Sequence, residues 1–204
     1  MKKTVLIFLV VCAFVFNIHA QNEINGHEYV DLGLSVKWAT CNVGANAPHE
    51  YGNYYAWGET ETKNSYNKSN SLTYRKVRDN ISGDASRDAS RANWGTCWRM
   101  PTKEEMLELI NGCNWTWTTQ NGTRGYKVIG RNGNSIFLPA AGGYDATTLG
   151  SRDKRCFYWT STPESGLDHF AWVLCTTVNN IKIDWTPPYY GFPIRPVSKP
   201  LPSY

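Results

Sequence analysis

A complete helix signal lies between Trp94 and Cys113, and it constrains the fold more than any other part of the chain. Thr102 is the expected N-cap, because its hydroxyl can accept a hydrogen bond from the Glu105 amide while the Glu105 side chain reaches back to the Thr102 amide. Asn111-Gly112 is expected to end the helix in a left-handed conformation. Three apolar residues fall on one face at helical spacing: Met106, Leu107 and Ile110. The sequence therefore predicts a short helix with one buried face.

Runs rich in β-forming residues, separated by turn signals, make up most of the remaining chain. These runs are Tyr29 to Leu32, Val36 to Cys41, Gly125 to Ile129, Ser135 to Leu138, Phe157 to Thr162, His169 to Cys175 and Ile181 to Trp185. The Asn-Gly pair within Arg131 to Asn134 is a strong hairpin signal, and Asn179-Asn180 can turn the chain tightly because Asn tolerates positive φ. The sequence predicts a single α+β domain of antiparallel hairpins packed with one or two short helices.

The segment from Glu59 to Arg91 is polar and repetitive, and it contains the tandem DASRDASR at Asp84 to Arg91. A polar stretch of this length buries little surface. We therefore expect a long surface excursion at about 59–91, with one short helical turn before Trp94.

The N-terminus has the pattern of a secretory signal peptide. Lys2-Lys3 precedes an apolar run from Val5 to Phe16, and Ala20 stands where a signal peptidase would cut. The run is too short for a membrane span, and no later stretch is long and apolar enough to be one. A lipoprotein signal is the alternative, since Cys12 lies inside the run, although no small residue precedes it. We expect residues 1–20 to be removed and 21–204 to be secreted, periplasmic or displayed at the cell surface.

The charge of the chain argues against nucleic acid as a partner. The formal net charge is +4, and it falls to +2 without the two lysines of the signal segment. No basic run with interleaved aromatic residues occurs. We therefore expect neither a nucleic-acid partner nor a membrane span in the mature chain.

Export brings the cysteines into an oxidising compartment, and an odd number of them remains after Cys12 is removed. If Thr162 pairs with His169 across a hairpin, Cys156 stands opposite Cys175, so we predict a disulfide between these two cysteines. Two buried free thiols are the alternative. The same register places four side chains on one face: Phe157, Trp159, Trp172 and Leu174. Three further cysteines compete for one more bridge: Cys41, Cys97 and Cys113.

Six segments of the chain occur in the order found in a known family. They are DLGLSVKWATCNVGA (31–45), YGNYYAWGET (51–60), NWGTCWRMPTKEEM (93–106), SIFLPAAG (135–142), FYWTST (157–162) and GFPIRPV (191–197). Together they resemble the Fibrobacter succinogenes major paralogous domain, which is common in exported proteins of Bacteroidetes. That domain is similar to the DUF1566 and formylglycine-generating-enzyme-like domains, which have a C-type-lectin-like fold. The resemblance covers nearly all of the mature chain.

The resemblance implies a compact C-type-lectin-like domain whose termini lie close together and whose C-terminal strands and loops form an exposed surface. It implies little about chemistry, because fold does not settle function. The Glu-Pro-Asn, Gln-Pro-Asp and Trp-Asn-Asp motifs of calcium-dependent lectins do not occur here. The local motif around the active-site cysteines of formylglycine-generating enzymes is also missing. Neither calcium-dependent sugar binding nor oxidase activity is therefore expected.

The closing segment Gly191 to Val197 is expected to return to the sheet that holds the N-terminal strands, as it does in the family. Phe192, Ile194 and Val197 should then be buried. Arg195 should be held by backbone carbonyls or a carboxylate, and Arg195→Ala is expected to destabilise the fold by about 1–3 kcal/mol. Ala substitutions of the preceding tyrosines, Tyr189 and Tyr190, are expected to weaken ligand binding and to leave stability nearly unchanged.

Catalytic signatures are not found in the sequence. It contains no H-E-x-x-H, no Gly-rich phosphate loop and no nucleophile elbow. The mature chain keeps three widely spaced histidines: His27, His49 and His169. Four loop carboxylates could serve a glycan-acting hydrolase as paired acids: Asp145, Asp153, Asp168 and Asp184. We expect no catalytic site, no metal and no cofactor, and we keep such a hydrolase as an alternative.

Aromatic residues give the strongest compositional signal, with nine tryptophans in the chain. Five of these are expected in the core: Trp38, Trp94, Trp98, Trp159 and Trp172. The predicted ligand contacts are His169, Asn179, Asn180, Trp185, Tyr189 and Tyr190, since flat aromatics and short amides make adaptable contacts.

We therefore predict a secreted or cell-surface binding module that presents its C-terminal loops to a protein or glycan. The resemblance extends to ligand-binding proteins diversified by retroelements, which place their variable residues in these strands and loops. A structural subunit of a surface assembly, held through exposed strand edges, is a further alternative.

Overall fold

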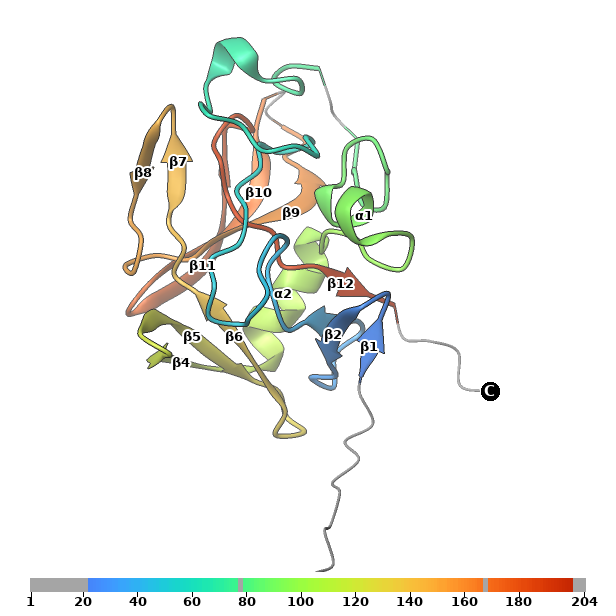
Figure 1. The fold of residues 1–204 in the computed structure, drawn as a ribbon, viewed down its shortest axis with the longest axis vertical. Helices are drawn as coiled ribbons and strands as arrows, with labels where there is room; N and C mark the ends of the chain where they lie inside the picture. The colour runs from blue at the N-terminus through green and yellow to red at the C-terminus, as the bar shows by residue number, and fades with distance from the viewer. Residues whose placement is uncertain (1–21, 77–78, 167–168, 200–204) are drawn as a thin grey trace, which may run out of the picture.

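Antiparallel strands and two short α-helices form the fold in a computed structural model, which describes residues 22–76, 79–166 and 169–199. The α+β prediction is therefore confirmed (Figure 1). The predicted signal peptide lies outside the described residues. No helix in the described part of the chain is both long and apolar enough to cross a membrane.

The first sheet joins the two ends of the described chain. Its strands, in the order β1-β2-β3-β12, are β1 (Glu23–Ile24), β2 (His27–Val30), β3 (Lys37–Ala39) and β12 (Val197–Ser198). Val197 pairs with Trp38, and Tyr29 pairs with Ala39. The last strand thus returns to the sheet of the N-terminal strands, as the closing segment predicted.

The other strands form three antiparallel groups. The central sheet has the order β11-β10-β9, with β9 (Phe157–Pro163), β10 (Ala171–Thr177) and β11 (Asn180–Thr186). A second sheet has the order β4-β5-β6, with β4 (Asn114–Gln120), β5 (Thr123–Ile129) and β6 (Ser135–Pro139). The hairpin of β7 (Gly143–Asp145) and β8 (Thr148–Gly150) stands beside the central sheet in Figure 1. The predicted β5–β6 hairpin is confirmed, whereas β4, β7 and β8 were not predicted.

The helix α2 (Lys103–Gly112) begins as the sequence predicted, and it packs against the central sheet. The Thr102 hydroxyl accepts from the Glu105 amide at 3.2 Å, and the Thr102 amide donates to the Glu105 carboxylate at 2.9 Å. Two details were wrong. Leu109, not Leu107, joins Met106 as a buried residue of the helix. The helix also ends at an extended Cys113 without a left-handed residue, because β4 begins directly afterwards.

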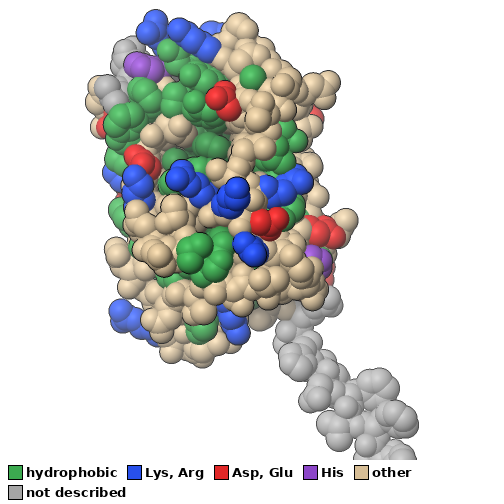
Figure 2. Space-filling view, turned by 90° about the vertical axis from the view of Figure 1, so that its left-hand side faces the viewer, with side chains coloured by type: hydrophobic (Ala, Val, Ile, Leu, Met, Phe, Trp, Pro, Cys, Tyr) green, Lys and Arg blue, Asp and Glu red, His purple; other side chains and the backbone are tan. Residues whose placement is uncertain are grey.

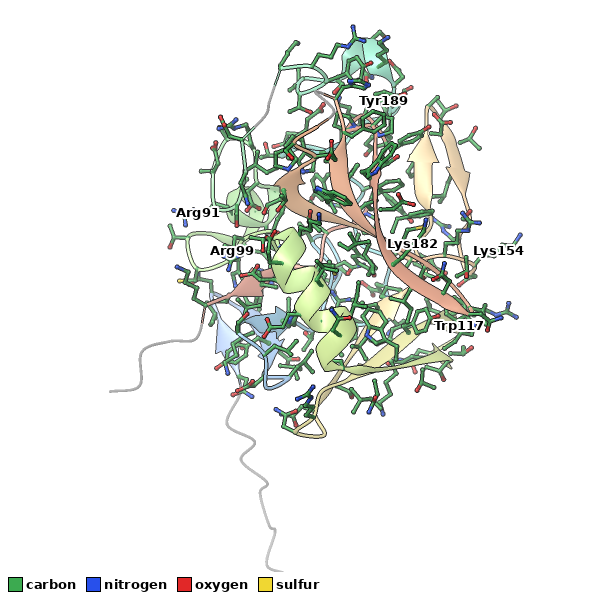
Figure 3. The ribbon with its side chains drawn as sticks, turned by 180° about the vertical axis from the view of Figure 1, so that it is seen from behind. Arg91, Arg99, Trp117, Lys154, Lys182 and Tyr189 are labelled. Atoms are coloured by element: carbon green, nitrogen blue, oxygen red, sulfur yellow. The ribbon has the colours of Figure 1, made fainter. Side chains whose placement is uncertain are left out.

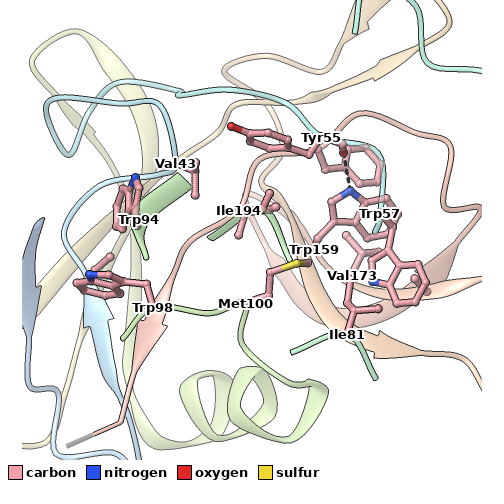
Figure 4. Close-up of a cluster of buried hydrophobic side chains, with 14 of the residues drawn as sticks. Val43, Tyr55, Trp57, Ile81, Trp94, Trp98, Met100, Trp159, Val173 and Ile194 are labelled. Atoms are coloured by element: carbon pink, nitrogen blue, oxygen red, sulfur yellow. Dashed lines mark hydrogen bonds between the residues drawn. The ribbon is translucent and has the colours of Figure 1, made fainter. Parts of the chain in front are cut away.

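The strands β9 and β10 of the central sheet are packed on both faces, which the predicted register did not allow for. Trp159 pairs with Val173 and faces one apolar cluster, shown in Figure 4. Tyr158 pairs with Leu174 and faces a second cluster, behind which α2 lies. Among the predicted core tryptophans, Trp172 is only half-buried, and the ammonium group of Lys103 lies 3.4 Å above its ring.

The predicted Cys156–Cys175 disulfide is not present, because the register differs by one residue from the predicted one. Cys175 pairs with Phe157, and Cys156 lies next to Thr176. Since side chains alternate between the faces of a sheet, the two thiols point to opposite sides. Both are free, as are the other described cysteines: Cys41, Cys97 and Cys113. Burial raises the pKa of Cys156 to about 12, so this thiol is unreactive in the folded protein.

The polar segment 59–91 is more than a surface excursion. It contains the 3₁₀ turn η1 (Lys68–Asn70), and it leads into the predicted short helix, α1 (Ala89–Trp94). Ile81 is fully buried in the cluster of Figure 4, and Asp88 is fully buried as the N-cap of α1. The polar composition concealed these two anchors, which tie the segment to the core.

Candidate functional site

Six aromatic side chains form a continuous surface at one end of the central sheet, and we call them the aromatic surface: Tyr74, His169, Phe170, Trp185, Tyr189 and Tyr190. Tyr74 is the link in this surface, since its ring centroid lies 5.6 Å from that of His169 and 5.6 Å from that of Tyr189. The surface continues from His169 through Phe170 to Trp185, with centroid separations of 4.5 and 4.8 Å. Trp185 is 44% exposed, and the other five rings are partly exposed.

The aromatic surface wraps around the end of the sheet instead of covering one face. Trp185 lies on the same face of β11 as Ile183, which packs into the α2-side cluster. Thr186 therefore points to the opposite face, where it lines a groove together with Tyr190. The predicted contacts Trp185 and Tyr190 thus border different faces, and Tyr74 and His169 connect them across the end of the sheet.

The groove has a volume of about 260 Å³ and lies between the β7–β8 hairpin and the central sheet. The Tyr190 ring stacks on Phe192 at 5.9 Å, and Phe192 stacks on Phe157 at 4.8 Å. Polar groups stand among these rings. The residues lining the groove are Gly143, Tyr144, Asp145, Gly150, Ser151, Phe157, Thr186, Tyr190 and Phe192. Figure 2 shows hydrophobic side chains gathered over the upper half of the face that includes this hairpin, with a hollow among them.

The loop after β11 is held firmly against the domain. The Trp57 amide donates to the Pro188 carbonyl at 2.8 Å, and Tyr55 and Phe192 exchange two backbone hydrogen bonds of 3.0 Å. Pro188 and Phe192 are buried, while Tyr189 lies between them at the upper end of the view in Figure 3. Because the backbone is fixed on both sides, the tyrosine rings are presented with little conformational freedom to lose on binding.

The two predicted asparagines do not join the aromatic surface. Asn179 lies in the β10–β11 turn and Asn180 is the first residue of β11, whereas Trp185 lies near the other end of that strand. Six residues of extended chain separate Asn179 from Trp185, which is roughly 20 Å. Both asparagines are exposed, but neither has the positive φ that the sequence suggested.

The loop carboxylates have separate environments. Asp153 accepts hydrogen bonds from the Tyr51 hydroxyl at 2.8 Å and from the Arg124 amide at 3.2 Å. Asp184 bonds to Lys182 at 2.5 Å; burial favours its protonated form, but this bond and the Trp185 amide outweigh burial and lower its pKa. Asp168 lies outside the described residues.

Asp145 is the carboxylate of the groove. Partial burial and the nearby Asp145 charge both raise the pKa of the Tyr190 hydroxyl. Burial, Tyr74 and Asp145 do the same for Tyr189. A single carboxylate beside two protonated phenols provides hydrogen-bonding groups, but it does not provide the acid pair that glycoside hydrolysis requires.

Sequence reasoning missed three parts of this site. Tyr74 stands in the polar segment, where nothing in the local pattern marks it. Phe157 was predicted only to share a sheet face with Trp159, and it is half-buried in the groove beside Phe192. Tyr144 belongs to the unpredicted β7–β8 hairpin, and its ring contacts Tyr54 and Tyr66 at centroid separations of 4.9 and 5.4 Å.

Comparison with known proteins assigns no family to this fold and site: no family model matches the chain, and neither does any curated protein or solved structure. Within the described ranges, no three His, Cys, Asp or Glu side chains gather in a way that could hold a metal ion.

Proposed function

We propose that this chain is an exported binding module, of C-type-lectin-like fold, that presents the aromatic surface and its groove to a protein or glycan. The observation that carries the proposal is the convergence of rings from three separate segments on one exposed region. Tyr74 comes from the polar segment, His169 from the loop before β10, and Tyr189 from the loop after β11. Side chains that only fill a core would be buried, and these are not.

The proposed fold is supported by the resemblance and by the pairing of the last strand with the N-terminal strands. Exposure also changes sharply along the C-terminal segment. Trp185 is exposed and Tyr189 and Tyr190 are partly exposed, whereas every residue from Gly191 to Ser198 is buried. This division suits a binding protein whose contact residues vary on a constant frame, which is the arrangement of retroelement-diversified proteins. A reverse transcriptase and a template repeat beside the gene would support that extension of the proposal.

Tyr189→Ala and Trp185→Ala are each expected to weaken ligand binding about tenfold or more, because exposed aromatic anchors typically contribute about 1–3 kcal/mol. The melting temperature should fall by no more than about 2 °C, since neither ring belongs to a buried cluster. The measurement is binding of residues 21–204 to a glycan and protein array, with a thermal melt of each variant. Tyr190→Ala is a poorer choice, because Tyr190 also packs against the core.

Val178→Ala is the matched control. Val178 is 51% exposed at the tip of the same β10–β11 hairpin, at the end away from the aromatic surface. We expect this variant to bind like the wild type. Loss of binding in Val178→Ala, with binding retained in Tyr189→Ala, would show that the hairpin tip, not the aromatic surface, contacts the ligand.

A further inference from the structure

Two cations lie on the groove side of the central sheet. Lys182 pairs with Cys175 and Cys175 pairs with Phe157, so these three side chains share the face of the sheet that lines the groove. Arg155 is two residues before Phe157. Burial raises the pKa of Cys175, and the charges of Arg155 and Lys182 oppose that rise.

The loop between β8 and β9 adds to this positive charge. Its only carboxylate, Asp153, is engaged by Tyr51 and by the Arg124 amide. Arg152 lies 4.8 Å from the Tyr51 ring centroid, and Lys154 is exposed. Arg155 is exposed as well, and no ion pair within the described residues uses Lys154 or Arg155. The loop therefore presents its cations outward and its carboxylate inward.

The cations and the aromatic rings lie on the same side of the molecule. In Figure 3, Lys154 lies at the right-hand edge of the molecule and Lys182 nearer its middle, both below Tyr189. Figure 2 views the molecule from that edge and shows Lys and Arg side chains beneath the hydrophobic region. Ser151 lines the groove at the start of the loop between β8 and β9, so this loop borders the groove. We call its three cations, Arg152, Lys154 and Arg155, the basic band.

The groove itself favours a compact, ring-shaped ligand with hydroxyl groups. Its volume of about 260 Å³ is below the usual range for drug-sized molecules, so it has room for little more than one ring. The rings of Tyr190 and Phe192 provide flat apolar faces, while Ser151, Thr186 and Asp145 provide hydrogen-bonding groups at the rim. A sugar ring has this combination of an apolar face and polar edges.

We propose that the ligand is an anionic saccharide, with one sugar ring in the groove and its carboxylate or sulfate groups against the basic band. This inference rests on the proposed binding function and adds the ligand class to it. The positive charge of the basic band favours a saccharide that carries negative groups over a neutral one. Lys182 contributes little net charge, because Asp184 pairs with it. Lys154 and Arg155 are therefore the residues that bind the negative groups of the saccharide.

The test is calorimetric titration of residues 21–204 with trigalacturonate, its fully methyl-esterified form and a chondroitin sulfate hexasaccharide. The esterified trimer keeps the same rings and removes the charges. We expect at least one of the two anionic probes to bind about tenfold more tightly than the esterified trimer, since each exposed ion pair adds a modest amount to the affinity. The preferred probe distinguishes carboxylate from sulfate recognition.

The double variant Lys154→Ala/Arg155→Ala should remove the preference for the anionic probe. The control is the double variant Lys127→Ala/Arg131→Ala, which removes two exposed cations from the β5–β6 hairpin. This control should keep the preference. Tyr189→Ala should weaken the binding of every saccharide. Failure of both anionic probes to bind more tightly than the esterified trimer would overturn the inference and leave the binding function intact, as would array binding only to proteins. Binding of hexaglutamate, with no binding of any of the three saccharides, would also overturn it. Anionic binding that Tyr189→Ala leaves unchanged would show simple charge attraction and contradict both proposals.

Discussion

Arg195→Ala is expected to lower the free energy of unfolding by about 3–5 kcal/mol. Arg195 is fully buried, and its guanidinium donates four hydrogen bonds. Two go to the carbonyls of Ala39 and Thr40 at 3.0 and 2.8 Å, one to the Phe137 carbonyl at 2.9 Å, and one to the Asn42 side-chain oxygen at 2.8 Å. Each acceptor would lose its partner inside the protein. The effect exceeds the 1–3 kcal/mol expected from the sequence because a single side chain satisfies four acceptors, three of them in buried hydrogen bonds and the Thr40 carbonyl in a partly buried one.

Urea denaturation of the purified variant measures this effect, and a thermal melt should show a decrease of about 10 °C. Arg195→Lys is the informative companion, because Lys keeps the charge but lacks the planar fork that reaches several acceptors at once. We expect Arg195→Lys to recover less than half of the lost stability. A melt of Arg195→Ala that matches the wild type would show that the closing segment is not part of the frame.

Asp88→Ala is expected to cost about 2–4 kcal/mol, because it removes both an N-cap and a buried junction. One carboxylate oxygen accepts from the Ser90 and Arg91 amides at 2.9 and 3.2 Å and caps α1. The other accepts from the Gly83 and Met100 amides at 2.7 and 2.8 Å. Asp88 thus joins the polar segment, α1 and the strand-like chain before α2. Burial raises the pKa of Asp88, and the four amides oppose that rise.

The chain provides its own control for Asp88 in the preceding repeat. Asp84 has the same local sequence, DASR, but it is partly exposed and bonds mainly within its own turn, to Ser86 and Arg87. Asp84→Ala should therefore cost less than about 1 kcal/mol. Urea denaturation of both variants tests the comparison. Similar losses in the two would contradict the junction role of Asp88.

The same repeat shows that the local sequence alone could not predict the burial of these two aspartates. Asp84 and Asp88 stand in identical four-residue contexts, yet one is partly exposed and the other is fully buried. The difference comes from Met100, whose amide reaches Asp88 from twelve residues away. Local patterns could predict the cap of α2, because Thr102 and Glu105 are three residues apart. A contact between distant segments, such as that of Asp88 with Met100, is not marked by any short-range residue pattern.

The register error at β9–β10 has a related cause. Alternation fixes a register when one face of a strand is apolar and the other is polar. In β9, Phe157, Tyr158 and Trp159 are all large and apolar, because the sheet has a packed cluster on each side. Two registers then satisfy the pattern equally well, and the pairing of Cys156 with Cys175 seemed to decide between them. The bulge between Ala171 and Val173 moves the true register further from the predicted one.

The candidate site was predicted in part. Trp185, Tyr189 and Tyr190 were identifiable because they stand in a Pro-rich segment after the last long strand, and His169 because it flanks a hairpin. Asn179 and Asn180 were also predicted as contacts, and they lie at the end of the hairpin away from the aromatic surface, since a seven-residue strand separates its two ends. Tyr74 depends on how the polar segment folds back over the sheet, which no short pattern records.

Hydrogen–deuterium exchange of residues 21–204, with and without the strongest array ligand, tests the central claim most directly. We predict slower exchange on binding in the β7–β8 hairpin and in the loop from Thr186 to Phe192, together with unchanged exchange at the Val178–Asn179 turn. Slower exchange confined to that turn, or to the edge strand β4, would contradict the proposed binding site, because the ligand would then bind away from the aromatic surface and its groove.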